Sequence, residues 1–427
     1  QTTLDESYAE KLSNDIEPWL DPESPEIFRK TNIIVAMKQK QHLSNLANLL
    51  SNVRGLDDVR VLIVDDEADQ YGLNVGESED DPSAIFNGIK ILREEVKQHS
   101  YLQYTATPAA NLLVAFENIL NPNFALNINP GPQYTELSDL FRTDSPYIET
   151  IGDDQDLGEN GEEEGGDEFE EPTMPDLLKQ ALKLYLIGLV SGYMRNMEAN
   201  NRSMLVHPSR LKLDHKQFRD WIKAELDLYK EILTEEGTSD YDELVQLFRL
   251  AHEDLKLTEN SLEPFNKMID DGWIPRAINT AELQIINSSR HRTVPPGQGI
   301  NWESYAHIIC SGQAVDRGTT VEGLTVTYMP RPASATQDTQ IQRARFLGYR
   351  EAYKNFIRIY LDPTSRKFYE DYHLADQSIR QLIDDHVDVD DFRTVVRNWK
   401  LNKGYRSCRE AAIKIINHKI IKGNAEW

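Results

Sequence analysis

An acidic run that directly follows an apolar run carries the clearest chemical signal in this sequence. Val61–Val64 leads straight into Asp65–Asp69, which reads Asp-Asp-Glu-Ala-Asp. A continuous apolar run is typical of a buried parallel strand, and ligands of parallel sheets bind beyond the carboxyl ends of the strands. We expect Asp66 and Glu67 to hold Mg²⁺, Glu67 also to orient and deprotonate an attacking water, and Asp69 to face the nucleotide. An ordinary acidic loop is the alternative.

A second motif, Tyr104-Thr105-Ala106-Thr107-Pro108, also follows an expected strand. Short hydroxyl side chains on both sides of an alanine can link two sites through hydrogen bonds. We expect Thr105 and Thr107 to couple the nucleotide site to a nucleic-acid path. The alternative is a strand that ends in a proline turn, which is a common arrangement.

Two further motifs lie in the second half of the chain. Asp316-Arg317-Gly318 occupies a loop between two expected strands, where backbone amides could approach a phosphate and the acid a ribose. Gln342–Arg350 contains Arg343, Arg345 and Arg350, and the planar, permanently charged guanidinium suits the stabilisation of phosphate charge. We assign Gln342 and Arg343 to nucleotide binding. The alternatives are an ordinary turn and a basic helix on a solvated face.

Two loops are candidates for gripping a nucleic-acid backbone. Lys38 and Lys40 follow the first apolar run, and Ser209 and Arg210 follow a later one. Such side chains contact phosphate without reading sequence. A solvated charged turn is an equal alternative for each loop, and His207 is expected to be a packed histidine.

These motifs, in this order, resemble a known family. The strings VDDEADQ, YTATPAANLLV, SMLVHPSR, DRGTTVEGLTVTY and QRARFLGYR are similar to those of the Z-one domain family, across roughly Asn32–Leu361. Its members are bacterial helicase-like superfamily two ATPases, often labelled endonucleases, in restriction or phage-defence clusters. The resemblance implies ATP and Mg²⁺ as cofactors. It also implies catalysis by Asp66, Glu67, Arg345 and Arg350, the two arginines that match the family pattern best.

The sequence departs from the family pattern at two places. Ala344 stands where the family has Gly. The 427 residues contain no Gly-x-x-x-x-Gly-Lys-Ser/Thr loop, which in related motors cradles the phosphates. We therefore expect the sequence to begin after that loop, with the first motor lobe truncated at its N-terminus.

The elements that must position these motifs follow from hydrophobic periodicity. Short apolar runs alternate with amphipathic stretches, which predicts an α/β fold with two RecA-like lobes built on parallel sheets. Strands are expected at 32–37, 59–64, 102–105, 203–207, 282–286, 305–310, 324–328 and 356–361, with helices at 39–53, 83–99 and 176–199. The predicted domains are 1–148 (lobe one), 149–175 (acidic flexible insertion), 176–365 (lobe two, with a helical insertion at 214–270) and 366–427 (C-terminal helices).

Composition narrows the class of protein. The formal net charge is −25, and residues 149–171 carry twelve acidic side chains and no Lys or Arg. That balance argues against a general nucleic-acid coat but leaves room for a local groove. No apolar run reaches the length of a membrane span, and the two cysteines, Cys310 and Cys408, suggest no disulfide framework, so a cytoplasmic location is expected.

The sequence thus predicts an ATP-dependent, helicase-like translocase that acts on nucleic acid, with DNA favoured, and that has protein partners in a defence or restriction complex. Two alternatives remain at this point. One is a catalytically silent motor fold that binds partner proteins, and the other is a subunit of a nuclease complex.

Overall fold

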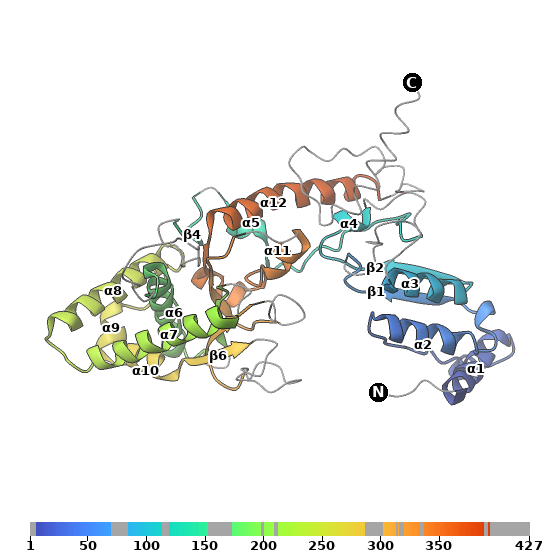
Figure 1. Cartoon of the computed structure of the whole chain (residues 1–427), viewed down its shortest axis with the longest axis horizontal. Helices are drawn as coiled ribbons and strands as arrows, with labels where there is room; N and C mark the ends of the chain where they lie inside the picture. Colours follow the sequence, from blue (N-terminus) through green and yellow to red (C-terminus); the bar gives the residue numbers. More distant parts are fainter. Residues whose placement is uncertain are drawn as a thin grey trace, which may run out of the picture. The chain divides into compact units, whose positions relative to one another are not determined.

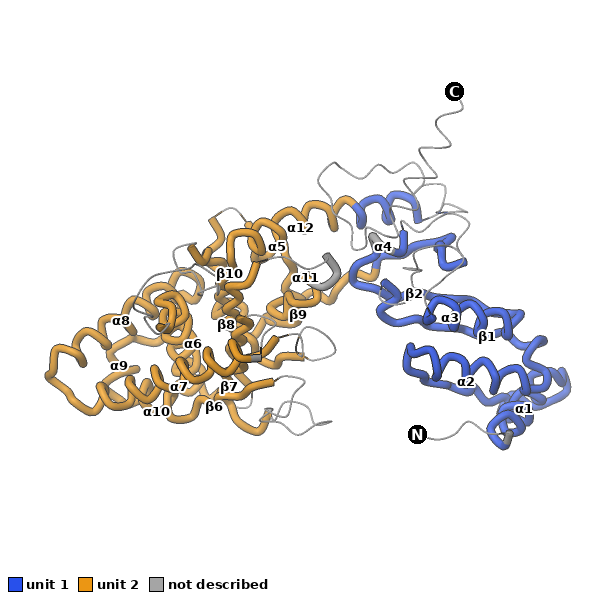
Figure 2. Tube along the Cα trace, viewed as in Figure 1, with its two compact units in different colours: residues 1–127, 336–338, 379–427 blue, residues 128–335, 339–378 orange. Residues whose placement is uncertain are grey.

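The computed structural model describes residues 6–69, 84–112, 119–142, 144–152, 173–197, 200–208, 212–286, 302–312, 315, 320–332, 337–387 and 392. The chain divides into two compact units, shown in Figure 2. Unit 1 comprises residues 1–127, 336–338 and 379–427, and unit 2 comprises residues 128–335 and 339–378. Residues 128–148, which we expected in the first lobe, fall in unit 2 because β4 (Ile148–Thr150) pairs with a strand of that unit.

Unit 1 packs helices against a small parallel sheet (Figure 1). Strands β1 (Val61–Asp65) and β2 (His99–Gln103) pair in register from Val61 opposite His99 to Asp65 opposite Gln103. Its helices are α1 (Glu6–Leu20), α2 (Lys40–Leu50), α3 (Ala84–Glu95) and α4 (Ala109–Leu112), with short 3-10 turns η1 (Glu26–Phe28) and η2 (Leu56–Asp58). A core of α1, α2 and α3 side chains, among them Leu43, Ile89 and Leu92, packs against Val61 and Tyr101. The helices predicted at 39–53 and 83–99 are confirmed in shorter form.

The strand predicted at 32–37 is wrong. Residues 31–37 form neither helix nor strand, and Ile33 and Val35 are 86% and 90% exposed. An apolar run becomes a strand only where a neighbour satisfies its backbone groups. Among the residues described in unit 1, β1 pairs only with β2.

Unit 2 is built on a six-stranded sheet with strand order β4-β10-β8-β5-β7-β6 and every pair parallel. After β4, its strands are β5 (Arg202–Val206), β6 (Glu282–Ile286), β7 (Ala306–Ser311), β8 (Leu324–Met329) and β10 (Arg358–Leu361). A separate antiparallel pair joins β3 (Tyr134–Thr135) to β9 (Gly348–Tyr349). The predicted α/β class and the strands of the second lobe are confirmed.

Both faces of this sheet are covered, as continuous apolar strands require. Met204 and Val206 of β5 join one core, which includes much of α6 (Asp176–Met194), whereas Leu205 between them joins a second core. The second core contains side chains of α5 (Leu137–Leu140) and α12 (Pro363–Asp384) and of the segment after α11 (Gln337–Arg343). The alternation along β5 places the two cores on opposite faces.

The predicted helical insertion is confirmed as α7 (Lys212–Ile232), α8 (Ser239–Lys256) and α9 (Phe265–Asp270), followed by α10 (Trp273–Thr280). Helix α12 starts three residues before the predicted C-terminal region, because Asp362 accepts hydrogen bonds from the backbone N–H groups of Thr364 and Ser365. Most of the acidic insertion lies outside the described residues. No helix in the described part of the chain is long and apolar enough to cross a membrane.

Candidate functional site

The acidic motif forms a tight turn at the carboxyl end of β1. Asp65 is the last residue of the strand, and its carbonyl accepts the backbone N–H of Tyr104 at 2.9 Å. The N–H of Ala68 in turn donates to the carbonyl of Tyr104 at 2.9 Å. Between these two bonds, Glu67 adopts a left-handed backbone with φ 50°, a conformation that is uncommon for a residue with a side chain. The carboxylates of Asp66 and Glu67 are thereby presented on an exposed, strained turn, a feature that clusters at functional sites.

The side chain of Lys38 binds three oxygen atoms of this turn. Its Nζ lies 2.7 Å from Asp65 Oδ1 and donates to the carbonyl oxygens of Asp66 and Glu67, both at 2.9 Å. We predicted Lys38 as a nucleic-acid contact, but its ammonium group is bound by three oxygens of the acidic turn. Of the pair predicted in this loop, Lys40 is the exposed one, at the first position of α2.

Asp65 receives a second donor from the neighbouring strand. The Tyr101 hydroxyl donates to Asp65 Oδ2 at 2.5 Å, and burial together with the Asp65 carboxylate raises the pKa of Tyr101. The guanidinium of Arg93 lies over the Tyr101 ring, 4.6 Å from its centroid. Asp65, which is 8% exposed, is therefore a structural acid. Sequence reasoning missed this arrangement because the strand expected at 102–105 begins one residue after Tyr101, whereas β2 begins at His99.

Asp69 connects the two motifs that the sequence singled out in this unit. Its Oδ1 accepts the Thr105 hydroxyl and its Oδ2 accepts the Thr107 hydroxyl, each at 2.7 Å. Asp69 is only 3% exposed, so its carboxylate faces these threonines rather than open solvent. The segment after β2 is thus fastened to the acidic turn after β1 by a buried, charge-assisted link.

The exposed pair of carboxylates fits a magnesium ion in its chemistry. Mg²⁺ usually keeps several waters and takes one or two protein carboxylates together with substrate phosphates. Asp66 Oδ1 accepts the backbone N–H of Glu67 at 3.0 Å, which orients that carboxylate. Asp66 and Glu67 are the side chains that could hold the ion.

In unit 2 the predicted loops leave the same edge of the sheet. Strands β5 and β7 are parallel neighbours, so Val206 and Ser311 both end their strands at the carboxyl edge. Ser209 and Arg210 of the first loop, and Asp316, Arg317 and Gly318 of the second, lie outside the described residues. His207 is 1% exposed, as expected for a packed histidine.

The arginine motif begins in the last turn of α11, which contains Gln342 and Arg343, and its arginines differ in burial and partners. Arg345 is half-buried, and its Nε donates to the carbonyl of Val315 at 2.9 Å, in the turn after β7. Arg350 is 7% exposed and donates to the carbonyl of Arg345 at 2.6 Å. We predicted both as catalytic groups, and only Arg345 lies beside the loop at the carboxyl edge.

The remaining residues of this motif pack inward to different degrees. Arg343 is 1% exposed, and its Nη1 donates to Gln340 Oε1 at 2.9 Å; Gln342 is half-buried. Ala344 is buried in the second core, where a side chain larger than glycine is accommodated. The predicted nucleotide-binding role of Arg343 is thus at odds with its buried guanidinium.

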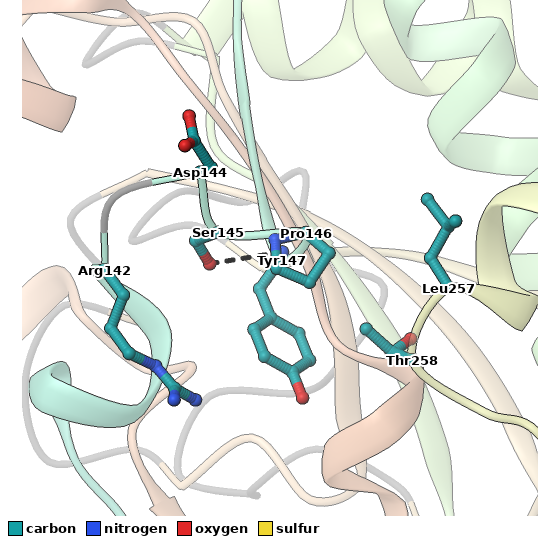
Figure 3. Close-up of a pocket in the computed structure, with 7 residues that line it drawn as sticks. All are labelled: Arg142, Asp144, Ser145, Pro146, Tyr147, Leu257 and Thr258. Carbon is teal, nitrogen blue, oxygen red and sulfur yellow. Dashed lines mark hydrogen bonds between the residues drawn. The ribbon is translucent and has the colours of Figure 1, made fainter.

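A cavity of about 370 Å³ opens in unit 2 and is shown in Figure 3. Arg142, Asp144, Ser145, Pro146 and Tyr147 line it from one loop, and Leu257 and Thr258 from another. Ser145 Oγ accepts the backbone N–H of Tyr147 at 3.3 Å, and Asp144 has a positive φ of 55°. None of the predicted site residues borders this cavity.

Comparison with known proteins identifies the family. The family model described as the Z1 domain matches residues 177–400, which is slightly more than half of the chain. The chain belongs to the Z1 domain family. This match confirms the resemblance to the Z-one family over residues 177–400, and the strings VDDEADQ and YTATPAANLLV lie before the matched range. Within the described residues the match spans nearly all of α6, five strands of the large sheet and α12. Neither the curated proteins nor the solved structures contain a match to this Z1 domain chain.

Proposed function

We propose that this Z1 domain protein is the motor core of an ATP-driven, helicase-like translocase that acts on nucleic acid, with DNA the expected polymer and bacterial restriction or phage defence the expected setting. The observation that carries the proposal is the Asp69 carboxylate, which binds both Thr105 and Thr107. A translocase must couple its site of ATP hydrolysis to its nucleic-acid binding site. Here a buried acid joins the exposed carboxylate turn to the segment after the neighbouring strand.

The roles of the side chains follow from their exposure. Asp66 would hold Mg²⁺, which when bound neutralises charge on the phosphates. Glu67, held in its left-handed conformation, would accept a proton from the attacking water. Arg345 would contribute positive charge at the carboxyl edge of the large sheet. Asp65 and Lys38 would keep the turn in place and take no part in the reaction.

The need for a phosphate-binding loop determines which protein should be used in the test. The 427 residues hold no Gly-x-x-x-x-Gly-Lys-Ser/Thr run, so these residues alone are expected to release no phosphate from ATP. The experiment should use the natural full-length gene product. We expect magnesium-dependent phosphate release that DNA stimulates, and a loss of release in Asp66→Ala.

The result would also decide between the proposal and a silent scaffold. Release equal to that of Asp66→Ala, with and without DNA, would remove the motor function. A scaffold of the same fold would then remain, with protein binding as its activity.

A further inference from the structure

The two arginines that match the family pattern reach different parts of unit 2. Arg345 Nε contacts the carbonyl of Val315, in the turn that follows β7. Arg350 Nη1 contacts the carbonyl of Val321 at 3.3 Å, three residues before β8 begins. Ligands of parallel sheets bind at the carboxyl ends of the strands. Arg345 therefore lies toward the ligand edge, whereas Arg350 lies toward the opposite edge.

The turn that Arg350 contacts is fixed to the start of β5. The N–H of Ser203 donates to the carbonyl of Gly323 at 2.8 Å, and the Ser203 hydroxyl donates to the carbonyl of Glu322 at 2.6 Å. Gly323 has φ +60°, and a Cβ there would lie 1.7 Å from the Asn201 carbonyl oxygen. Only glycine permits this approach, so the residues before β8 form a rigid support for Arg350.

Tyr353 completes the surroundings of Arg350. Its hydroxyl oxygen accepts a hydrogen bond from Arg350 Nη1 at 2.6 Å, and the Arg350 guanidinium lies 5.7 Å from the ring centroid. The Arg202 guanidinium also lies over this ring, 4.7 Å from the centroid. Arg202 is 2% exposed and makes no ion pair with a carboxylate of the described residues. The ring of Tyr353 thus stabilises two buried cations through its π face.

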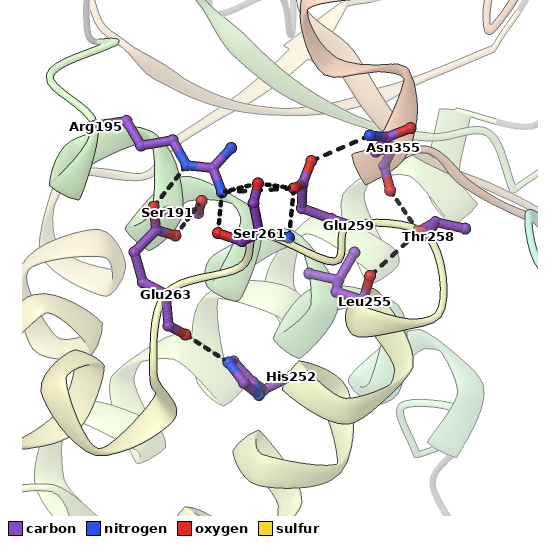
Figure 4. A network of polar contacts seen from close by, with 9 residues as sticks. All are labelled: Ser191, Arg195, His252, Leu255, Thr258, Glu259, Ser261, Glu263 and Asn355. Atoms are coloured by element: carbon purple, nitrogen blue, oxygen red, sulfur yellow. Dashed lines mark hydrogen bonds and ion pairs between the residues drawn. The ribbon is translucent and has the colours of Figure 1, made fainter.

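Tyr353 is itself anchored by its own segment, η4 (Glu351–Phe356), in which it has a non-helical backbone with φ −146°. Figure 4 shows how the far end of η4 joins a polar network. Asn355 Nδ2 donates to Glu259 Oε2 at 3.2 Å, and Glu259 Oε1 lies 3.7 Å from Arg195 Nη2. The Thr258 hydroxyl donates to the carbonyl of Asn355 at 2.6 Å. This network fixes η4 to α6 and to the loop after α8.

We propose that Arg350 is a positioning residue, held by Tyr353, whose guanidinium fixes the main chain of Arg345 so that Arg345 alone presents its charge to the nucleotide. The proposal rests on the ATPase function proposed above. Arg350 reaches Arg345 through the carbonyl oxygen at 2.6 Å and so controls the backbone on which the Arg345 side chain is carried. Small displacements of a charge that acts on the transition state lower the rate more than they lower binding.

The test uses Tyr353→Phe in the full-length gene product, with Tyr349→Phe as the matched control. The first variant keeps the ring over Arg202 and removes the side-chain acceptor of Arg350, while the carbonyl acceptors of Val321 and Arg345 remain. The control removes a hydroxyl that accepts the N–H of Gly131 at 3.3 Å and, within the described part of the chain, makes no hydrogen bond to the Arg350 guanidinium. We expect Tyr353→Phe to lower kcat about tenfold with KM for ATP unchanged, and Tyr349→Phe to leave both unchanged.

A double-mutant cycle separates positioning from general loosening of the fold. In an Arg345→Lys background, where the positioned guanidinium is gone, Tyr353→Phe should lower kcat by less than twofold. Equal effects of Tyr353→Phe in both backgrounds, or kcat equal to that of Tyr349→Phe, would overturn the positioning role while leaving the ATPase intact. A wild-type protein without ATPase activity would overturn both proposals, and the two failures are therefore distinguishable.

Discussion

The Thr107 hydroxyl donates to Asp69 Oδ2 at 2.7 Å across two strand ends that are 38 residues apart in the sequence. Asp69 is 3% exposed, and the same carboxylate also accepts Thr105. A buried carboxylate needs such donors because its desolvation is costly. The bond therefore contributes to the stability of unit 1 whether or not the protein hydrolyses ATP.

Replacement of Thr107 by valine, which has a similar shape, should destabilise unit 1. The variant leaves Asp69 Oδ2 without the hydroxyl donor, and the expected loss is about 1–3 kcal/mol in the free energy of unfolding. Urea unfolding followed by hydrogen exchange of peptides from β1 and β2 would report it. Thr31→Val is a suitable control because Thr31 is exposed. Unfolding midpoints that agree for the two variants would contradict the prediction.

Glu67→Gln should separate nucleotide binding from turnover in the full-length gene product. The amide keeps the size of the side chain but cannot accept a proton from water, so turnover should fall by about 10²–10⁴. Affinity for ATP, measured by fluorescence titration, should remain within a factor of a few. An unchanged turnover number would exclude Glu67 as the general base.

Lys38→Met and Lys40→Met form a matched pair that tests the reassignment of Lys38. Loss of the Lys38 ammonium leaves Asp65 and two carbonyl oxygens without their shared donor. The expected destabilisation is about 1–3 kcal/mol. Lys40 is exposed, and its loss should leave stability within about 0.5 kcal/mol.

The same pair of variants addresses nucleic-acid binding. When a lysine that contacts phosphate is removed, the slope of log affinity for DNA against log salt concentration decreases in magnitude by roughly one. If Lys38→Met changes that salt slope with no effect on unfolding, the original interpretation of Lys38 as a nucleic-acid contact is right and the structural one is wrong.

The sequence predicted the second sheet well because its strands are apolar on both faces. The strand expected at 282–286 coincides with β6, and the expected strands for β5, β7, β8 and β10 differ by one or two residues at their ends. The sixth strand, β4, reads Ile-Glu-Thr and was not predicted. Continuous apolar runs bounded by turns leave little ambiguity when helices cover both faces. The same pattern failed at 32–37, because periodicity reports what a segment could bury and not whether a partner strand is present.

The acidic turn also shows what the sequence could and could not predict about the candidate site. The spacing of the motifs was enough to predict Asp66, Glu67, Thr105 and Thr107 as neighbours of one edge. It could not show that Asp69 faces the threonines, nor that the guanidinium of Arg350 turns inward. Side-chain direction depends on packing, as the buried Phe346 and the ring of Tyr353 illustrate. A tyrosine three residues after an arginine was the only signal for that contact.

Lys183 provides a prediction about pH. It lies on α6, is 6% exposed, and its Nζ is 5.0 Å from the centroid of the Tyr229 ring. Burial lowers the pKa of Lys183 from 10.5 to about 8, with Lys179 adding to the decrease and Glu225 and Asp176 opposing it. Because the native pKa lies below the unfolded one, the unfolded state binds more protons between about pH 8 and pH 10.5, and stability rises with pH in that window.

Below pH 8 both states are protonated, and the full cost of burying the charge, about 3 kcal/mol, is present. Lys183→Met removes the charge and keeps the length of the side chain, so it should stabilise unit 2 at pH 7. The gain is reduced by the contribution of the lost cation–π contact with Tyr229. The difference between variant and wild type should shrink steadily from pH 8 to pH 9.5. Urea unfolding at four or five pH values measures it, with the exposed Lys223→Met as the control. A difference that stays constant across the window would mean that Lys183 keeps an ordinary pKa in the folded protein.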